Sequence, residues 1–221
     1  MELALGGERF LADRSGALYW PAERTLIVAD LHLEKASFFA ARGVMLPPYD
    51  TNATLEALSQ VLKVYEPIRV IALGDSFHDG GGGARLSPES RAALLALQHS
   101  REWVWISGNH DPDIIEEIGG RFSEVFQRRN LTFQHQPGSG AFEIVGHFHP
   151  VARVYVRGRT VRRRCFAASE RRMVLPAFGS LTGGFNIRDT AFLGIMDGEF
   201  FAHMLGNEEI FSFAAAHCLP D

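Results

Sequence analysis

The pattern of hydrophobic and polar positions changes in character along the chain. In its first part, short apolar runs alternate with segments of helical spacing, which is typical of strands connected by helices. From about Leu131 onward the pattern predicts strands instead, at residues 131–135, 142–146, 152–157, 160–167, 172–177, 191–197 and 199–204. Helix-alternating strands followed by an all-strand half predict an α/β fold, with two sheets packed face to face and helices outside.

The first part of the chain carries ordinary signals for the ends of its elements. Two or three short strands are expected within residues 3–28, and further strands at 68–73 and 103–107. Helices are predicted at residues 34–42, 51–65, 87–100 and 112–118. Gly43 can end the first helix, and Ser87 with Pro88 can open the third, because serine is a favoured N-cap and proline fits the first turn. Neither a repeat nor a linker interrupts the pattern, so we expect one domain over residues 1–221.

Composition excludes several classes of protein. The 221 residues are 46% apolar and 22% charged, which is globular composition, and a chain of this length buries roughly 70% of its extended surface. Cys165 and Cys218 match neither a paired zinc spacing nor a secreted disulfide framework, which favours a reducing compartment. The first residues lack the regions of a signal peptide, and no apolar stretch approaches the ~20 residues of a membrane helix. We therefore expect a soluble, cytoplasmic protein with no membrane partner.

Positive charge is concentrated in one segment, although the formal net charge is −4. Arginines occupy positions 153, 157, 159, 162, 163, 164, 171 and 172. One interpretation of this cluster is the solvated face of a strand pair. The other is a surface for nucleic-acid phosphates, because the arginine fork matches phosphate oxygens. Under the second interpretation, the candidate substrate-binding residues are Arg153, Arg157, Arg162, Arg163 and Arg164.

Four apolar runs end in side chains of the types that bind metal ions. The polar ends are Asp30-Leu31-His32, Gly74-Asp75, Gly108-Asn109-His110-Asp111 and Gly146-His147-Phe148-His149. In layered α/β folds, sites are built where such strands end. In extended chain, Asp30 and His32 would point the same way while Leu31 faces the core, and His147 and His149 repeat this spacing. Carboxylate, imidazole and amide ligands without thiolate fit Mn²⁺, Fe²⁺ or Zn²⁺, so a metal centre is the leading hypothesis.

Taken together and in this order, the four motifs resemble those of the calcineurin-like metallophosphoesterases. The motifs and the strands that carry them span residues 26–150, over half of the chain. Each motif alone is a weak signal, whereas four in the family's order are a strong one. The resemblance implies a four-layer α/β/β/α sandwich of two packed mixed sheets flanked by helices, with a two-metal site.

The ligand set that the resemblance implies is shared between two divalent ions, with Asp75 bridging them. The family pattern assigns Asp30, His32 and His149 to the first metal, and Asn109, His147 and one further histidine to the second. His135 is the only histidine between residues 111 and 147, so it fills the remaining place. Taken alone, His135 is equally compatible with an ordinary surface residue.

The same resemblance implies hydrolysis of a phosphoester without an enzyme nucleophile. Two divalent ions about 3.5–4 Å apart lower the pKa of a shared water, and the bridging hydroxide attacks phosphorus. The resemblance makes His110 the proton donor to the leaving oxygen, with Asn109 or His110 neutralising the developing charge and Asp111 orienting the His110 ring. Asp111 and Pro112 also fit the start of the next helix, and the two roles are compatible.

Further strings narrow the resemblance to one group. Residues 29–35, 74–79, 175–179 and 183–186 look like the corresponding segments of bacterial DNA ligase-associated metallophosphoesterases, which are described as damage-response endonucleases. This resemblance implies a Mn²⁺-dependent phosphodiesterase that cuts DNA during repair, in functional association with a DNA ligase and a helicase. Fe²⁺, Zn²⁺ and Ni²⁺ are the alternative metals, and assembly into an oligomer stays open.

Two other functions stay open at this point. One is a small-molecule phosphoesterase, acting on a nucleotide, a dinucleoside polyphosphate or a lipid-linked pyrophosphate. The other is a metal-free protein-binding scaffold, but relatives of that kind lose ligands, whereas every expected ligand is present here.

Three segments near the motifs carry weaker signals. The glycine run 80–83 lacks the lysine and spacing of a P-loop, so we interpret it as a flexible loop beside the active-site mouth. The segment 179–184 is interpreted either as a connection whose backbone approaches substrate or as a plain turn. His78 and Asp79 follow Asp75 closely, which favours a role in supporting a ligand histidine.

Overall fold

The first part of the chain forms the first of two β-sheets. The computed structural model describes residues 1–110 and 118–221. Within them this sheet has seven strands in sequence order: β1 (Glu2–Leu5), β2 (Glu8–Ala12), β3 (Leu18–Trp20), β4 (Thr25–Val28), β5 (Arg69–Leu73), β6 (Glu102–Ile106) and β7 (Arg121–Ser123). β1 to β4 pair antiparallel, whereas β4 to β7 run parallel. Parallel strands need cover on both faces, and nearly every residue of β4, β5 and β6 is buried.

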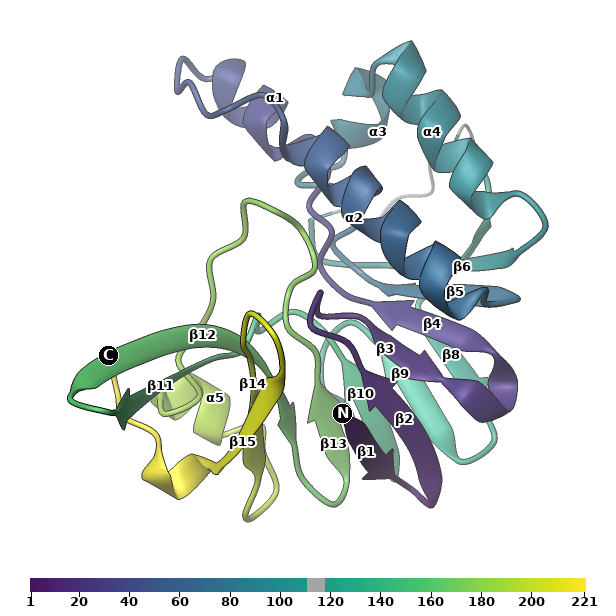
Figure 1. Cartoon of the computed structure of the whole chain (residues 1–221). Helices are drawn as coiled ribbons and strands as arrows, with labels where there is room; N and C mark the ends of the chain where they lie inside the picture. Colours follow the sequence, from purple (N-terminus) through teal and green to yellow (C-terminus); the bar gives the residue numbers. More distant parts are fainter. Residues whose placement is uncertain (111–117) are drawn as a thin grey trace.

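Helices cover the outer face of this sheet (Figure 1). The helices of the first part are α1 (Lys35–Ala40), α2 (Asp50–Tyr65), α3 (Gly82–Arg85) and α4 (Pro88–Gln98), with a 3-10 turn η1 (Pro21–Glu23) before β4. The start of α4 is capped as predicted, because Ser87 Oγ accepts a hydrogen bond from the Ser90 N–H at 3.1 Å. Across the described residues, no helix is both long and apolar enough to span a membrane.

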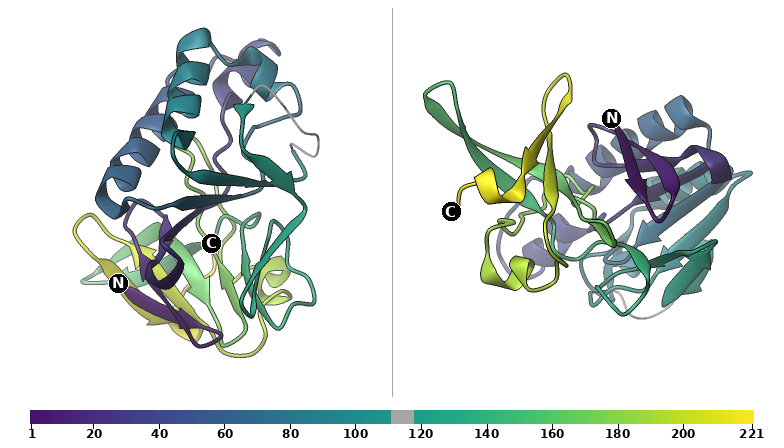
Figure 2. Two further views of the ribbon diagram at one scale, coloured as in Figure 1. Left: turned by 90° about the vertical axis from the view of Figure 1, so that its right-hand side faces the viewer. Right: turned by 90° about the horizontal axis from the view of Figure 1, so that it is seen from below.

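The second sheet is built from the later part of the chain. Its strand order is β15 (Ile210–Ala214), β14 (Phe201–Leu205), β12 (Arg159–Ala168), β13 (Arg172–Val174), β10 (Phe142–Val145), β9 (Leu131–Gln134) and β8 (Val125–Arg128). β11 (Val151–Val156) pairs with β12 alone, and Figures 1 and 2 show this hairpin projecting from the rest of the sheet. The outer face carries α5 (Thr190–Leu193), and the 3-10 turn η3 (Ala215–His217) follows β15.

Three apolar layers hold the fold together. The layer between the sheets contains Phe10, Trp20, Phe133 and Phe166, all fully buried. A second layer lies between the first sheet and helices α2 and α4, and a third lies between the second sheet and the segment around Phe192 of α5. The predicted α/β/β/α order of two mixed sheets flanked by helices is therefore confirmed.

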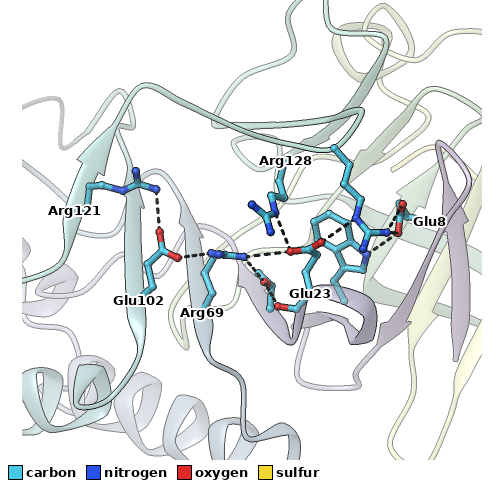
Figure 3. A network of polar contacts seen from close by, with 9 residues as sticks. Glu8, Glu23, Arg69, Glu102, Arg121 and Arg128 are labelled. Atoms are coloured by element: carbon cyan, nitrogen blue, oxygen red, sulfur yellow. Dashed lines mark hydrogen bonds and ion pairs between the residues drawn. The ribbon is translucent and has the colours of Figure 1, made fainter.

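Charged side chains line the edge at which the parallel strands of the first sheet begin (Figure 3). Arg69 at the start of β5 pairs with Glu102 at the start of β6, with an N–O distance of 2.6 Å, and lies 3.8 Å from Glu23. Arg128 at the end of β8 donates to Glu23 at 2.8 Å. The Arg69 and Glu23 side chains are mostly buried, at 13% and 10% exposure, whereas Glu102 and Arg128 are more exposed. This set links the first sheet to the second along one edge.

Several predicted elements differ from the structure. The apolar run 191–197, predicted as a strand, starts instead as α5, and Asp189 caps this helix by accepting a hydrogen bond from the Ala191 N–H at 2.9 Å. A short apolar run has the same pattern in a strand and in a buried helical turn. The glycine run 80–83, predicted as a loop, ends in α3. The helix predicted at 112–118 falls almost entirely outside the described residues. The sequence pattern did not predict β7, β8 and β15, which are partly exposed.

The buried pair of Arg172 and Glu143 provides a test of the second sheet. Arg172 donates to Glu143 at 2.8 and 2.5 Å, and their side chains are 10% and 1% exposed. Replacing Arg172 with leucine leaves a buried carboxylate without its cation, so we expect the free energy of unfolding to fall by about 3–5 kcal/mol. The matched control is Arg171→Leu, because Arg171 makes an exposed pair with Asp197 and should cost at most about 1 kcal/mol. Equal losses in urea denaturation would contradict the expectation.

Candidate metal centre

The loops that follow β4, β5, β6, β9 and β10 meet at one edge of the molecule. The three first-sheet strands are parallel to one another, and so are β9 and β10, so their carboxyl ends come together within each sheet. The His32 N–H donates to the Asp75 carbonyl at 2.9 Å and joins the first two loops. The His147 N–H donates to the two carboxylate oxygens of Asp30 at 3.1 and 3.0 Å. This last contact joins the two sheets, because His147 follows β10.

The first ligand group is formed by Asp30, His32 and His149, whose ligand atoms all lie within 4.8 Å of one another. His149 Nε2 lies 3.3 Å from Asp30 Oδ1 and 3.2 Å from His32 Nε2. Asp30 and His32 are buried, at 0% and 6% exposure. The structure thus brings together the three residues predicted for the first metal.

The second group is formed by Asp75, His135 and His147, again within 4.8 Å. His135 Nε2 lies 3.4 Å from Asp75 Oδ2, 3.1 Å from His147 Nδ1 and 3.0 Å from Asn109 Oδ1. The Leu73 carbonyl accepts a hydrogen bond from His135 Nδ1 at 2.9 Å, which leaves Nε2 to face the centre. His135 is therefore placed with the other ligands and is not a surface residue.

The donor set fits a pair of divalent cations. Each group contains two imidazole nitrogens that face each other at 3.1 to 3.2 Å, and only one nitrogen of such a pair can carry the proton between them. The two groups are adjacent, since His135 Nδ1 lies 3.8 Å from Asp30 Oδ1. Carboxylate, imidazole and amide donors without thiolate match the ligands of first-row divalent ions.

Most of these ligand residues have left-handed backbone. The φ angles lie between 44° and 67° at Asp30, His32, Asp75, His147 and His149. Non-glycine residues in this region cost of order 1–3 kcal/mol each and cluster at functional sites. The prediction that Asp30 and His32 point the same way because the chain is extended is therefore wrong about the backbone. Both side chains still reach the centre, and Leu31 is buried in the core at 1% exposure.

Glycines allow neighbouring segments to approach the ligand loops closely. At Gly74, with φ of +72°, a Cβ atom would lie 2.4 Å from His135 Nδ1. At Gly179 it would lie 2.2 Å from the Leu31 carbonyl oxygen, and at Gly184 2.3 Å from that of His149. The segment 179–184 is thus pressed against the loops that carry the first ligand group, which a plain turn would not require.

Two carboxylates make the centre attractive to positive charge. Burial alone would raise the pKa of Asp75, but His135 outweighs it and lowers this pKa to about 2. Burial alone would lower the pKa of His135, but its hydrogen bond to Asp75 and the charge of Asp30 raise it to about 9. At His32, burial and then repulsion from His149 lower the pKa to about 3. A proton on His135 therefore supplies positive charge where a metal cation would supply it.

His110 lies at the exposed side of the centre. Its backbone N–H donates to Asp75 Oδ1 at 2.9 Å, and its Nε2 lies 4.0 Å from Asp75 Oδ2. The ring is 43% exposed and stacks on His78, with ring centroids 5.4 Å apart. Asp111, predicted to orient this ring, lies outside the described residues. The sequence pattern did not predict that His78 is a neighbour of His110. The only signal in the sequence was that His78 lies three residues after Asp75.

The residues beside His78 complete one wall of the centre. The His78 ring also packs edge-on against Phe38 at 4.6 Å between centroids. Burial, followed by the charge of Lys35, lowers the pKa of His78 to about 4. Asp79 forms an ion pair with Arg85 of α3, so in the described structure its partner is an arginine and not a ligand histidine.

The predicted substrate-binding arginines do not form one uniform surface. Arg162 pairs with Asp221 at 3.1 Å, and Arg153 donates to the Pro220 carbonyl at 2.9 Å. Arg164 is partly buried and donates to the Ala177 carbonyl at 2.5 Å. The other two are exposed: Arg163 in β12 and Arg157 in the turn at the outer end of the β11–β12 hairpin.

Gly74 provides a test of how the ligand loops are packed. Gly74→Ala combines a strained backbone with a clash against the His135 ring, so we expect the free energy of unfolding to fall by roughly 2–5 kcal/mol and divalent-metal affinity to drop. Gly158→Ala is the matched control, because φ is +80° but no atom lies within 4 Å. Gly158→Ala should lower the free energy of unfolding only by the cost of the left-handed backbone, roughly 1–2 kcal/mol, and should leave the divalent-metal affinity unchanged. The same loss of metal affinity in both variants, by calorimetric titration, would contradict this account.

The raised pKa of His135 predicts that metal binding releases a proton. Below pH 9 the ring is protonated in the metal-free protein, and a cation must displace that proton. Mn²⁺ binding at pH 8 should therefore release about one proton, and affinity should rise with pH until about pH 9. The measurement is the dependence of the calorimetric binding enthalpy on the ionisation enthalpy of the buffer. An enthalpy independent of the buffer would rule out this proton.

Several solved structures are similar to this chain. It is similar to nuclease MPE of Pseudomonas putida, with 28% identity and a TM-score of 0.73 over 96% of this chain and 99% of that one. It also aligns with YfcE, a phosphoesterase from E. coli, at 12% identity and a TM-score of 0.41 over 86% and 98% of the two chains. Vps29 from Entamoeba histolytica, complexed with Zn²⁺, aligns at 14% identity and a TM-score of 0.37 over 86% and 97%. A comparison with curated protein sequences found no match.

The family model for calcineurin-like phosphoesterases matches residues 23–163. This segment is more than half of the chain, and it contains every residue of both ligand groups and His110. The family predicted from the four motifs is confirmed: the chain belongs to the calcineurin-like phosphoesterases, which are metal-dependent hydrolases.

Proposed function

We propose that the protein is a two-metal-dependent phosphodiesterase that hydrolyses the backbone of DNA. The observation that carries the proposal is the pair of adjacent ligand groups with the His110 ring at their exposed side. Asp30, His32 and His149 would hold one cation, Asn109, His135 and His147 the other, and Asp75 would be shared. When bound, two such cations lower the pKa of a water molecule and neutralise charge on phosphoryl oxygens. Mn²⁺ is the proposed metal, with Fe²⁺, Zn²⁺ and Ni²⁺ as alternatives.

We propose that His110 donates a proton to the leaving oxygen. Its backbone N–H is fixed on Asp75, and its ring is supported on one face by His78. The side chain is 43% exposed, so an oxygen of a large substrate can reach the ring. Asn109 would add its amide to the charge stabilisation, and we propose that Asp111 orients the His110 ring.

Two observations support DNA as the substrate. The Pseudomonas putida neighbour is named a nuclease, and it aligns with almost the whole of this chain. The second observation is the concentration of arginines between residues 153 and 172. The arginines proposed to contact DNA are Arg153, Arg157, Arg162, Arg163 and Arg164. These two observations, and the segments that resemble ligase-associated metallophosphoesterases, support a role in DNA repair. We propose that the protein acts in the cytoplasm beside a DNA ligase and a helicase.

His110→Ala tests the proposed role of the ring. Cleavage of single-stranded DNA releases a sugar alkoxide, which needs a proton. In the variant, the Mn²⁺-dependent cleavage rate should therefore fall by about 10²–10⁴-fold. An aryl phosphodiester releases an aryl oxide that leaves without a proton, so its hydrolysis should fall less. His99→Ala, at an exposed histidine after α4, is the control and should leave both rates unchanged. The measurement is the initial rate on each substrate.

Substrate class decides between the proposed function and a small-molecule enzyme. We expect Mn²⁺-loaded protein to cleave DNA and an aryl phosphodiester faster than an aryl phosphomonoester. Fast turnover of the monoester, with neither diester cleaved, would reject the nuclease assignment.

A further inference from the structure

A polar pocket of about 400 Å³ lies where the β11–β12 hairpin meets the segment before α5. Its basic lining comes from Arg14, in the loop between β2 and β3, and from Arg162, Arg163 and Arg164 of β12. Thr182 contributes a hydroxyl to the wall. Residues far apart in the sequence thus bring four arginines into the lining of one cavity, which we call the arginine pocket.

Three of these four arginines have no carboxylate partner among the described residues. Arg162 is paired with Asp221, whereas Arg14, Arg163 and Arg164 donate hydrogen bonds to backbone carbonyl groups. Some arginines elsewhere in the fold have acidic partners, as Arg128 and Arg129 have in Glu23, whereas others, such as Arg24 and Arg101, also bond to carbonyl groups. The positive charge of the pocket is therefore not balanced within the described structure.

Arg164 makes this imbalance costly. The side chain is partly buried, and burial without a neighbouring carboxylate lowers its pKa. A guanidinium has five N–H donors, and the one bond to Ala177 leaves most of them for other partners. Buried charges are ordinarily paired, and the arginine fork matches the oxygens of a phosphate in a bidentate way. The arrangement favours a phosphate anion.

The wall of the pocket is continuous with the metal centre. Gly183 lines the pocket, and its neighbour Gly184 lies against the His149 carbonyl, with a virtual Cβ only 2.3 Å from that oxygen. Arg162 donates to the Gly184 carbonyl at 3.1 Å, and the Val151 N–H donates to the Phe185 carbonyl at 2.9 Å. A strand that leaves the centre on the His149 side and follows this segment would reach the pocket.

We propose that the arginine pocket binds a backbone phosphate of the DNA strand whose scissile phosphate lies at the metal centre. The assignment rests on the proposed function, because it needs a polymeric phosphodiester. Among the described residues no aromatic side chain lines the pocket, so it lacks the usual platform on which bases stack. The pocket holds the strand through its backbone, which makes the contact independent of base sequence.

The test compares two double variants that remove the same charge. Arg14→Gln with Arg163→Gln removes two exposed arginines of the pocket, and Arg159→Gln with Arg171→Gln removes two exposed arginines outside it. Both are made in the Mn²⁺-loaded His110→Ala protein, so that a labelled single-stranded oligonucleotide stays intact. Binding is measured by fluorescence anisotropy at several salt concentrations, and thermal melting checks that each variant is folded.

We expect the pocket variant to bind the oligonucleotide at least about tenfold more weakly. The slope of log affinity against log salt should become less negative by about 0.7 per arginine lost. The outside variant should keep affinity and slope close to those of the parent. In the otherwise unaltered enzyme, the pocket variant should lose more DNA cleavage than aryl phosphodiester hydrolysis, because the aryl diester does not extend into the pocket.

Each other outcome overturns the proposal. Equal losses of oligonucleotide affinity in the two double variants would mean that positive charge anywhere on the surface attracts DNA. If the His110→Ala parent does not bind the oligonucleotide, DNA is not the ligand of the pocket. If inorganic phosphate binds in an Arg14- and Arg163-dependent way while DNA affinity is unaffected, the pocket serves a free anion. Failure of the proposed function is recognised separately, because the Mn²⁺-loaded protein that retains His110 would then hydrolyse no phosphodiester, whatever the binding comparison gives.

Discussion

The hydrogen bond from the backbone N–H of His147 to the Asp30 carboxylate is the contact on which the rest of the site depends. Asp30 follows β4 of the first sheet and His147 follows β10 of the second, so one buried carboxylate fixes the two sheets at their shared edge. His135 adds a second link by donating to the Leu73 carbonyl at the end of β5. A buried carboxylate must be hydrogen-bonded, so Asp30 holds the loop of His147 in place. The contacts of these ligand residues therefore also hold the two sheets in position over the apolar layer between them.

The two edges of the parallel strands have different roles. At the amino ends, Arg69, Glu102 and Glu23 form the charged row that links the first sheet to β8. At the carboxyl ends, carboxylates and imidazoles converge on two adjacent points, and the backbone is left-handed at most ligand positions. Left-handed backbone also occurs before these strands, at Arg24, Glu66 and Ser100. At the carboxyl ends it coincides with converging carboxylates, whose charge a cation can compensate, whereas the amino ends carry their own ion pairs.

The ligand residues could be predicted from the sequence because each follows a buried apolar run directly. A strand that is buried on both faces must leave the core at its end, and parallel strands leave the core at the same edge of the sheet. The backbone at Asp30 and Asp75 could not be predicted, because neither residue is a glycine and the left-handed φ is imposed by contacts between loops. The pattern of 191–197 was ambiguous without the Asp189 cap, and the stacking of His78 on His110 depends on how separate loops pack.

The close approach of Gly179 and Gly184 to the ligand loops bears on how much of the chain the centre needs. The family model ends at residue 163, yet these glycines, after β13, press on the backbone of Leu31 and His149. A chain shortened to the matched segment would retain all the ligands and lose the buttress that fixes the curvature of their loops. Boundaries drawn from the alignment alone would therefore yield a fragment with the right residues and a relaxed, poorly organised coordination sphere.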